Sequence, residues 1–455
     1  MRVRTVDRIE GRPLVHYAAL GVAVLCSVLL VAVAPRHSPL AIGLVVGATL
    51  ACGVLAVWER RTPRLGVRPV MAAIALVFAV AVVKPPTTSN DLWSYGMYGR
   101  MVTVHDANPY VAVPNDFRSD PLFDRVSPIW QHRPSVFGPV WVGYEAVGSL
   151  LMGSSPLGTR LFFQLTAAAA AVAVLVLIWR RTRSTAALVW LGLHPMFGAV
   201  AINGGHNDVV IGLGILAGAL LAGRRWGGAA GFVLGLVALI KITALLALVG
   251  VVLWAYRQRR WRVAATATAG AAAALVIGYL PFVGDAAHVL ANSDHTVTPG
   301  SLWNGVTDLL LGHNAWSDVL HPLAYNGTLD AIFWVSVVTV AVVALVLGFR
   351  AGREGSPRPA VGAATASYPM AAGYAQPWYS SWSLPVFTDA APSPLAWVVW
   401  IQAAVMLAAL KLPTQWDGSV VEVFARALLS YVAPLALFVA FVVVGLRARP
   451  GAVGP

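Results

Sequence analysis

The sequence predicts an all-α polytopic membrane protein, a bundle of about 12 to 14 transmembrane helices with two sizeable external loops. Composition gives the first reason: 58% of the 455 residues are hydrophobic and 11% are charged, whereas soluble domains carry about 25% charged residues. The mean hydropathy of +0.72 agrees. The second reason is that basic residues fall in short clusters between apolar spans, as the positive-inside rule expects. The net charge of +13 is therefore a topology signal, and no nucleic-acid partner is expected.

The N-terminal part is predicted to cross the membrane three times. Its first apolar run, 14–34, follows a basic start and ends in Ala32-Val33-Ala34, which is similar to a signal-peptide cleavage site. Because the run is long and many spans follow, we expect a retained first helix. A second helix over about 39–58 and a third over about 66–83 then place segment 84–138 outside.

The basic clusters also place the later helices. Only one crossing between segment 84–138 and Arg180 keeps that arginine inside, and segment 139–153 has about 15 residues against the roughly 20 that a span needs. We therefore expect 139–153 to be interfacial or re-entrant. Further crossings are predicted over 158–179, 184–202, 207–223, 262–283 and 327–348, and the chain is then expected outside at 376, inside near 390, outside at 411 and inside again at Arg447.

The stretch 226–256 is predicted to be a tight hairpin, because arginines at both of its ends must lie inside. Its external tip falls at or near Lys241. A second external loop is expected over 284–326. Residues 1–455 are interpreted as a single domain with both termini cytoplasmic.

Segment 84–138 is predicted to be a catalytic external loop. It contains Asn90-Asp91-Leu92-Trp93-Ser94-Tyr95 and more than a quarter of the chain's 19 acidic residues. A carboxylate at the end of a membrane helix, beside aromatic residues and arginines, suits a general base. Asp91 is the candidate base; the alternative is that Asn90 and Asp91 only cap the following helix. The same loop contributes Tyr95, Arg100, His132 and Arg133.

Other polar residues lie at the outer ends of later spans. His206-Asn207-Asp208 is interpreted either as part of the site or as a turn with a helix cap. His206 and Asp208 have metal-ligand chemistry, but one such group does not define a metal site, so a divalent metal is left open and no other cofactor is predicted. Lys241 is costly at membrane depth unless paired. It either binds an anion such as a lipid phosphate or extends toward the membrane surface.

Aromatic residues complete this side of the protein. Gln376-Pro377-Trp378-Tyr379, followed by Trp382, belongs either to an interfacial aromatic belt or to platforms for a sugar ring or an isoprenoid chain. The cytoplasmic side carries short arginine clusters and little else. This one-sided convergence predicts an active site at the outer membrane surface.

Taken in order, these motifs resemble the GT-C superfamily of lipid-linked sugar transferases. In detail they are similar to the actinobacterial polyprenol-phosphate-mannose-dependent α-mannosyltransferases. The resemblance extends over about 90–385, and the second external loop does not share it. The matching pieces are Ser89-Asn90-Asp91-Leu92-Trp93-Ser94-Tyr95, Asn108-Pro109-Tyr110, Ser127-Pro128-Ile129-Trp130, Phe137-Gly138-Pro139, Gly205-His206-Asn207-Asp208, Lys241-Ile242-Thr243, Gln376-Pro377-Trp378-Tyr379 with Trp382, and Leu384-Pro385.

The resemblance implies a GT-C-like bundle in the plasma membrane that uses polyprenyl-phosphate mannose as donor and a glycolipid or glycan as acceptor, among membrane lipids. Asp91 would remove the acceptor proton in one inverting displacement that gives an α-mannoside. Lys241, with Arg100 or Arg133, would neutralise the departing phosphate. The sugar or acceptor would be bound by Tyr95, His132, His206, Asn207, Asp208, Trp378 and Tyr379.

Other functions stay open at the level of sequence. Related transferases use other polyprenyl-phosphate sugars, such as arabinofuranose. A transporter or flippase of lipid-linked sugars would also have many helices, but it would place charges near the bilayer midplane and show repeats. A glycan-binding membrane scaffold would need only the aromatic and acidic loop. No glycine-rich phosphate loop follows a strand, which argues against a nucleotide-sugar donor.

Overall fold

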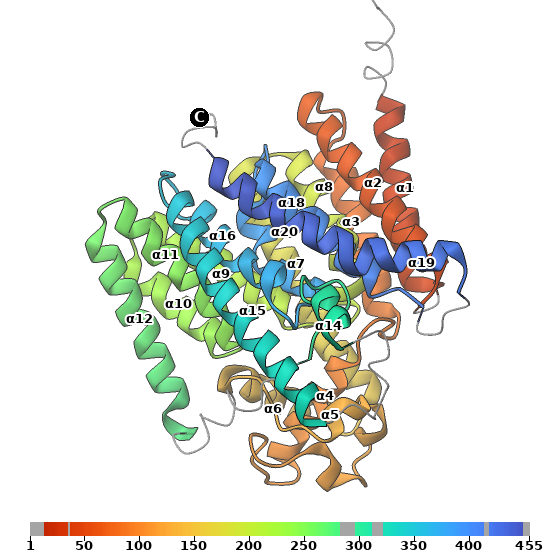
Figure 1. Cartoon of the computed structure of the whole chain (residues 1–455), viewed down its shortest axis with the longest axis vertical. Coiled ribbons are helices and arrows are strands. Elements are labelled where there is room, and N and C mark those ends of the chain that lie inside the picture. Colours follow the sequence, from red (N-terminus) through yellow and green to blue (C-terminus); the bar gives the residue numbers. More distant parts are fainter. Residues whose placement is uncertain (1–12, 35–36, 283–295, 312–321, 414–417, 449–455) are drawn as a thin grey trace, which may run out of the picture.

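The computed structural model describes residues 13–34, 37–282, 296–311, 322–413 and 418–448, and over these ranges it contains helices and loops but no strand. Six helical segments in the described chain are long and apolar enough to cross a membrane, and the prediction of an all-α polytopic membrane protein is confirmed (Figure 1). These segments are α1 (Pro13–Ala32), α2 (Pro39–Arg61), α7 (Pro156–Thr182), α12 with η5 (Trp261–Phe282), most of α15 (Pro322–Ala351), and α19, η7 and α20 together (Val420–Arg447).

Shorter apolar helices pack between the long ones and carry much of the buried core. They are α3 (Val67–Val83), α9 (Asp208–Gly223), α10 (Gly227–Ala238), α11 (Leu245–Arg257) and α18 (Pro394–Ala409). The helix α16 (Arg358–Ala371) lies beside α11 and α15. Small residues allow several of these contacts, since a Cβ on Gly231 of α10 would overlap the backbone of α12 at Ala267.

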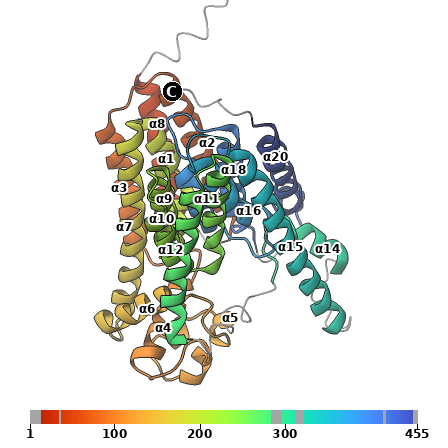
Figure 2. The same ribbon diagram turned by 90° about the vertical axis from the view of Figure 1, so that its left-hand side faces the viewer.

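The predicted external segment 84–138 contains one longer helix and three short ones, joined by turns and loops. It contains α4 (Asp91–Thr103), the short helices η1 (Pro114–Phe117), η2 (Phe123–Arg125) and α5 (Pro128–Gln131), and it leads into α6 (Pro139–Met152). Figures 1 and 2 both show α4, α5 and α6 at the end of the molecule opposite α8 (Thr185–Gly192). The 14 residues of α6 form a single short helix, in keeping with the expectation that this stretch does not span the bilayer by itself.

The predicted hairpin over 226–256 is confirmed as a turn in the chain. Helix α10 ends at Ala238, η4 (Ile242–Ala244) starts α11, and Lys241 between them has extended backbone with φ −149°. The turn is held by the start of α6: the Gly138 N–H donates to the Ile240 carbonyl (3.0 Å) and the Val140 N–H to the Leu239 carbonyl (3.1 Å). The end of segment 84–138 is thereby fixed to the tip that carries Lys241.

The prediction of one continuous helix over 184–202 is wrong. The stretch 184–202 was expected as one span, but it forms α8 (Thr185–Gly192) and a π-helical turn, η3 (Phe197–Ile202). Pro195 lies between them, and a proline lacks the N–H that an α-helix needs at this point. π-Helical turns are often found at functional sites, and η3 leads directly to the Gly204-Gly205 turn before α9.

The second predicted external loop is described only in part, because residues 283–295 and 312–321 lie outside the described ranges. The described piece, 296–311, includes α14 (Asn304–Leu311) and is attached to the last residue of α16 and to the chain just after it. The Thr298 hydroxyl donates to the Ala375 carbonyl (2.6 Å), and the Trp303 indole N–H donates to the Ala371 carbonyl (2.6 Å). Residues 296–311 are therefore bonded to segment 371–375, which leads into η6 (Pro377–Trp382).

Candidate active site

Four distant parts of the chain meet around a small group of charged and aromatic side chains. They are the first turn of α4, the turn before α9, the tip between α10 and η4, and η6. The close contacts among them join Asp91, His206, Asp208, Lys241, Trp378, Tyr379 and Trp382. The sequence predicted that these segments share one side, and the structure brings them into one cluster.

Asp91 is the first residue of α4. Its Oδ2 lies 3.5 Å from Nδ1 of His206, and the Asp91 side chain is 23% exposed whereas the His206 side chain is 0% exposed. The alternative in which Asn90 caps α4 is not observed, because Asn90 makes no side-chain capping bond. The carboxylate is thus placed at the boundary between a buried imidazole and solvent.

His206 is held by an aromatic partner. Its ring stacks on Trp378 with a centroid distance of 3.9 Å and an interplanar angle of 16°. Trp378 belongs to η6 and is itself buried. The stack therefore joins the turn before α9 to η6 and fixes the plane of the imidazole that faces Asp91.

Lys241 and Asp208 form the charged pair of the cluster. The Lys241 Nζ donates to Oδ1 of Asp208 at 3.1 Å, and the Trp382 indole N–H donates to the same oxygen at 2.9 Å. Asp208 is fully buried and Lys241 is 17% exposed. The sequence alternative in which Lys241 extends to the membrane surface does not fit these contacts, since the ammonium turns inward to a carboxylate.

Aromatic rings surround the Lys241 ammonium. It lies 4.4 Å from the ring centroid of Tyr379, 5.6 Å from Trp382 and 5.8 Å from Phe137. Cation–π contacts of this kind are favourable where water is excluded. They keep a charged group at depth while the ammonium retains hydrogen-bond donors beyond the one given to Asp208.

Three consecutive residues before and at the start of α9 carry unsatisfied polar atoms. Both ring nitrogens of His206, both side-chain polar atoms of Asn207 and Oδ2 of Asp208 are buried without a hydrogen-bond partner among the described residues. The residue at the N-cap position of α9, Asn207, makes no side-chain capping bond. Buried polar groups are normally paired, so a cluster of unpaired ones suits a bound polar ligand.

Tyr95 lies beside the site as part of its wall. Its ring makes edge contacts with Phe137, Trp141 and Phe163 at centroid distances of 5.1 to 5.4 Å. It is only 1% exposed. Tyr95 therefore supports the Phe137 ring that faces Lys241.

Arg100 has a different set of contacts from the one that the sequence predicted. Its Nε lies 2.8 Å from Oδ2 of Asp120, and its Nη1 donates to the Gly153 carbonyl at 3.0 Å. The pair is buried and also includes His105, whose Nε2 lies 2.8 Å from the same Asp120 oxygen. These bonds hold segment 84–138 to the turn after α6 and occupy Arg100, so it is not assigned to bind phosphate.

The carboxyl of Asp120 is acidic despite its burial. Burial alone would raise its pKa, but the Leu122 backbone N–H and the side chains of His105 and Arg100 stabilise the charged form and lower the pKa below its ordinary value. The other two predicted residues of this segment are more open. Arg133 is half-buried with its guanidinium 5.8 Å from the Trp130 ring, and His132 is exposed.

The models of two known families match the chain. The model of the family described as alpha-(1->6)-mannopyranosyltransferase, N-terminal domain, matches residues 11–257, and that of glycosyltransferase family 87 matches residues 149–371. The chain belongs to the alpha-(1->6)-mannopyranosyltransferase family. It is a glycosyltransferase, as the sequence motifs predicted. No curated protein gave a match to the chain.

The matched ranges divide the site of this glycosyltransferase. Asp91, His206, Asp208 and Lys241 fall within residues 11–257, whereas η6 with its aromatic residues lies beyond both ranges. The stack of Trp378 on His206 and the Trp382–Asp208 bond therefore attach a part of the chain outside the family matches to the part inside them.

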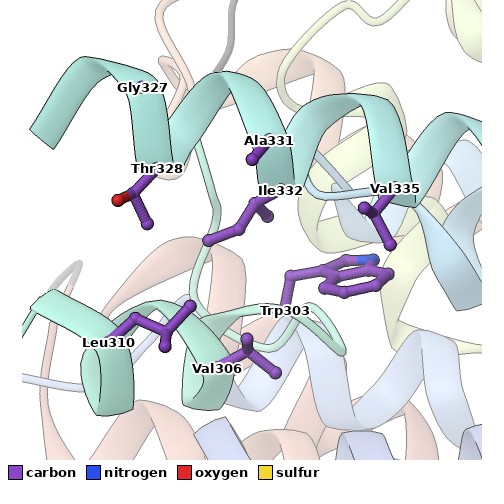
Figure 3. A pocket seen from close by; sticks show the side chains of 8 residues that line it. All are labelled: Trp303, Val306, Leu310, Gly327, Thr328, Ala331, Ile332 and Val335. Carbon is purple, nitrogen blue, oxygen red and sulfur yellow. The ribbon is translucent and has the colours of Figure 1, made fainter. Parts of the chain in front are cut away.

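An apolar groove runs between α14 and α15 of the transferase. It has a volume of about 560 Å³, and Figure 3 shows Trp303, Val306 and Leu310 facing Ala331, Ile332 and Val335 across it. Val335 is 51% exposed, so the groove opens at the outside of the helical bundle. Its Trp303 end is bonded to Ala371, six residues before Pro377 at the start of η6.

Sequence reasoning missed several polar residues of the transferase. Asn203 and Gln164 are fully buried and bond to the chain before Asp91, and Lys411 donates to the Thr88 hydroxyl at 2.8 Å. An asparagine or glutamine within an apolar run was the available signal, because such amides need partners. No group of three or more His, Cys, Asp or Glu side chains that could hold a metal was found in the described ranges.

Proposed function

We propose that this glycosyltransferase moves a mannosyl residue from polyprenyl-phosphate mannose to a lipid-linked or glycan acceptor at the outer face of the plasma membrane, with inversion to an α-mannoside. The proposal rests on one observation: the partly exposed carboxylate of Asp91 and the partly exposed ammonium of Lys241 belong to the same cluster of side chains. Asp91 contacts His206, and Lys241 contacts Asp208, two residues further along the chain.

Asp91 is the general base in this proposal. It accepts the proton of the acceptor hydroxyl as that oxygen attacks the anomeric carbon, and the bond to the phosphate oxygen breaks on the opposite face. His206 lies on the buried side of the Asp91 carboxylate. The Asp91 side chain is 23% exposed, and its exposed part faces the incoming hydroxyl. The unpaired atoms of Asn207 and Asp208 are suited to hold sugar hydroxyls.

Lys241 binds the donor phosphate. The leaving group gains negative charge as the bond breaks, so it needs a cation more than a proton. Asp208 orients Lys241 but also neutralises it. Charge balance therefore calls for a second cation, and we assign Arg133, which is half-buried in the external segment and near the aromatic Trp130.

A lipid-linked substrate suits the surroundings of the site. The groove between α14 and α15 is lined by apolar side chains and opens at the surface of the bundle. An isoprenoid or acyl chain would bury apolar surface there at about 25 cal/mol per Å². The aromatic rings of Trp378 and Tyr379 border the cluster and would contact the sugar.

Transfer is tested directly with purified protein, polyprenyl-phosphate mannose and a series of lipid-mannoside acceptors. We expect an α-linked product, with parallel reactions on polyprenyl-phosphate arabinofuranose and on a nucleotide sugar giving little or none. Reactions with and without EDTA determine whether a divalent metal takes part. Product from the nucleotide sugar, or from the arabinofuranosyl lipid alone, would overturn the proposed donor.

A further inference from the structure

The seven residues between α3 and α4, 84–90, determine the position of Asp91. Side chains from other helices and turns hold this segment by hydrogen bonds to its backbone. Helix α3 ends at Val83, and Pro85 and Pro86 follow shortly after. In a continuing helix the N–H of residue 85 would donate to the Ala81 carbonyl, but a proline has no N–H. The Ala81 carbonyl is thus left without a helical partner inside the protein.

Two buried amide side chains supply the missing donors. The Nδ2 of Asn203 donates to the carbonyls of Ala81 (3.0 Å), Lys84 (3.2 Å) and Pro85 (3.0 Å). The Nε2 of Gln164, from α7, donates to the Ala81 and Lys84 carbonyls at 3.2 and 3.0 Å. Both side chains are fully buried, so water does not compete for these bonds.

The side-chain oxygen of Asn203 binds the same segment at Thr87, a position nearer to Asp91 in the sequence. Its Oδ1 accepts the Thr87 N–H at 2.8 Å and the Thr87 hydroxyl at 3.0 Å. Thr87 precedes Asp91 by four residues. A single amide therefore uses both its donor and its acceptor side on the segment that ends at the proposed base.

The chain continues from Asn203 into the turn that carries His206, on the other side of Asp91. The Gly204 N–H donates to the Val200 carbonyl (2.7 Å) and the His206 N–H to the Ala201 carbonyl (2.9 Å), with Gly205 at φ +62°. His206 is thus three residues from Asn203 through a tight turn. Gln164 joins this arrangement too, since it donates to the Asn203 carbonyl at 2.7 Å.

We infer that Asn203 is a positioning residue for transfer: it fixes the segment that carries Asp91 onto the turn that carries His206, and so sets where the Asp91 carboxylate stands relative to the bound substrates. The inference rests on the proposed function of Asp91. Displacing a reacting group by about 1 Å can reduce turnover about 10²-fold, without any loss of contact to donor or acceptor.

The test is Asn203→Asp, which preserves shape and the acceptor for Thr87 but turns the donor nitrogen into an oxygen facing three carbonyls. We expect kcat to fall about 10²-fold with the KM for the donor unchanged. In an Asp91→Asn background the same substitution should cause no further loss, because the base that it positions is gone. Thr365→Val is the matched control, since that buried hydroxyl bonds only within α16.

If Asn203→Asp does not fold, Thr87→Val replaces it, because it removes only the hydroxyl bond to Asn203 and should lower kcat less but in the same direction. A rise in the KM for the donor with kcat unchanged, or full additivity with Asp91→Asn, would overturn the positioning role. Failure of the proposed function is recognised separately: Asp91→Asn would then retain turnover. Loss of turnover in Asp91→Asn with full turnover in Asn203→Asp rejects the inference alone.

Discussion

The Asp91 carboxylate faces Nδ1 of His206 at 3.5 Å, and the imidazole of that histidine lies flat against Trp378 at 3.9 Å. The histidine thus lies against the buried side of the Asp91 carboxylate, whose side chain is 23% exposed, and the stack on Trp378 fixes the position of the imidazole.

The first prediction follows from this geometry. Asp91→Asn keeps the size of the side chain but removes the base, so turnover should fall about 10²-fold or more. Thermal unfolding should be close to that of the wild type, because the side chain is partly exposed. Asp124→Asn is the matched control: it removes an exposed carboxylate of the same segment, 84–138, and should leave turnover unchanged. Equal turnover in the two variants would remove Asp91 from the mechanism.

The second prediction separates binding of phosphate by Lys241 from its pairing with Asp208. Lys241→Met should raise the KM for the lipid donor, but it also leaves a buried carboxylate unpaired, which costs about 3–5 kcal/mol of folding stability. The double variant Lys241→Met/Asp208→Asn removes that cost. Stability measured by thermal unfolding should then recover while the KM for the donor stays high.

A contrary result for this pair would be equally clear. If the donor KM of the double variant returns to the wild-type value, Lys241 serves only to neutralise Asp208, and the phosphate is held by other cations. Lys241→Arg should retain part of the activity, because it keeps the charge near Asp208 while changing the shape of the donor group.

The turn at Lys241 could be predicted from the sequence because it depends on local quantities: the positions of arginines and a segment too short for two full spans. Its partner could not. Asp208 lies 33 residues away at the start of α9, and the packing of α9 against α10 brings the two together. The sequence placed both residues on one side, which is the limit of a topology argument.

For Arg100 the sequence predicted a contact to phosphate, whereas the structure gives it a partner within the protein. An arginine beside Asp91 in an external segment has the right charge for a phosphate, but its partner Asp120 is decided by how the segment folds back through η1 and η2. The break at Pro195 was visible in the sequence, yet prolines are tolerated in membrane helices. Asn203 is bonded to Lys84, Pro85 and Thr87, and its bond to Thr87 joins positions 116 residues apart, so no local sequence pattern could predict it.

The third prediction concerns pH and the Arg100–Asp120–His105 group. Because the pKa of Asp120 is lowered in the folded protein, its charged form contributes stability above the pKa of the unfolded chain, and this contribution is lost as the pH falls through the folded value. Asp120→Asn should therefore lower the unfolding temperature near pH 7, and the difference from wild type should shrink below about pH 4. A difference that stays constant down to pH 3 would contradict the assignment.

The fourth prediction concerns the orientation of the chain in the membrane. In a background with Cys26 and Cys52 replaced by alanine, a cysteine introduced by Ser119→Cys should react with an impermeant thiol reagent in intact cells. One introduced by Gly355→Cys should react only after permeabilisation. Both positions are exposed, and a Cβ at Gly355 meets no neighbour, so access alone decides the result. The reverse pattern would place the proposed active site on the cytoplasmic side.

The last prediction tests how closely α9 must approach η6. Gly212 follows Asp208 by one helical turn, and a Cβ there would overlap the Ser381 carbonyl, next to the Trp382 that donates to Asp208. Gly212→Ala should push the two elements apart, cost about 1–3 kcal/mol of stability and reduce turnover by lengthening the Trp382–Asp208 bond. Gly143→Ala is the matched control in α6, where a Cβ meets open space and the change should be neutral or stabilise by about 0.4–1 kcal/mol. Thermal unfolding and turnover of the two variants decide the matter: if Gly212→Ala behaves like Gly143→Ala in both measurements, the contact between α9 and η6 does not set the geometry of Asp208.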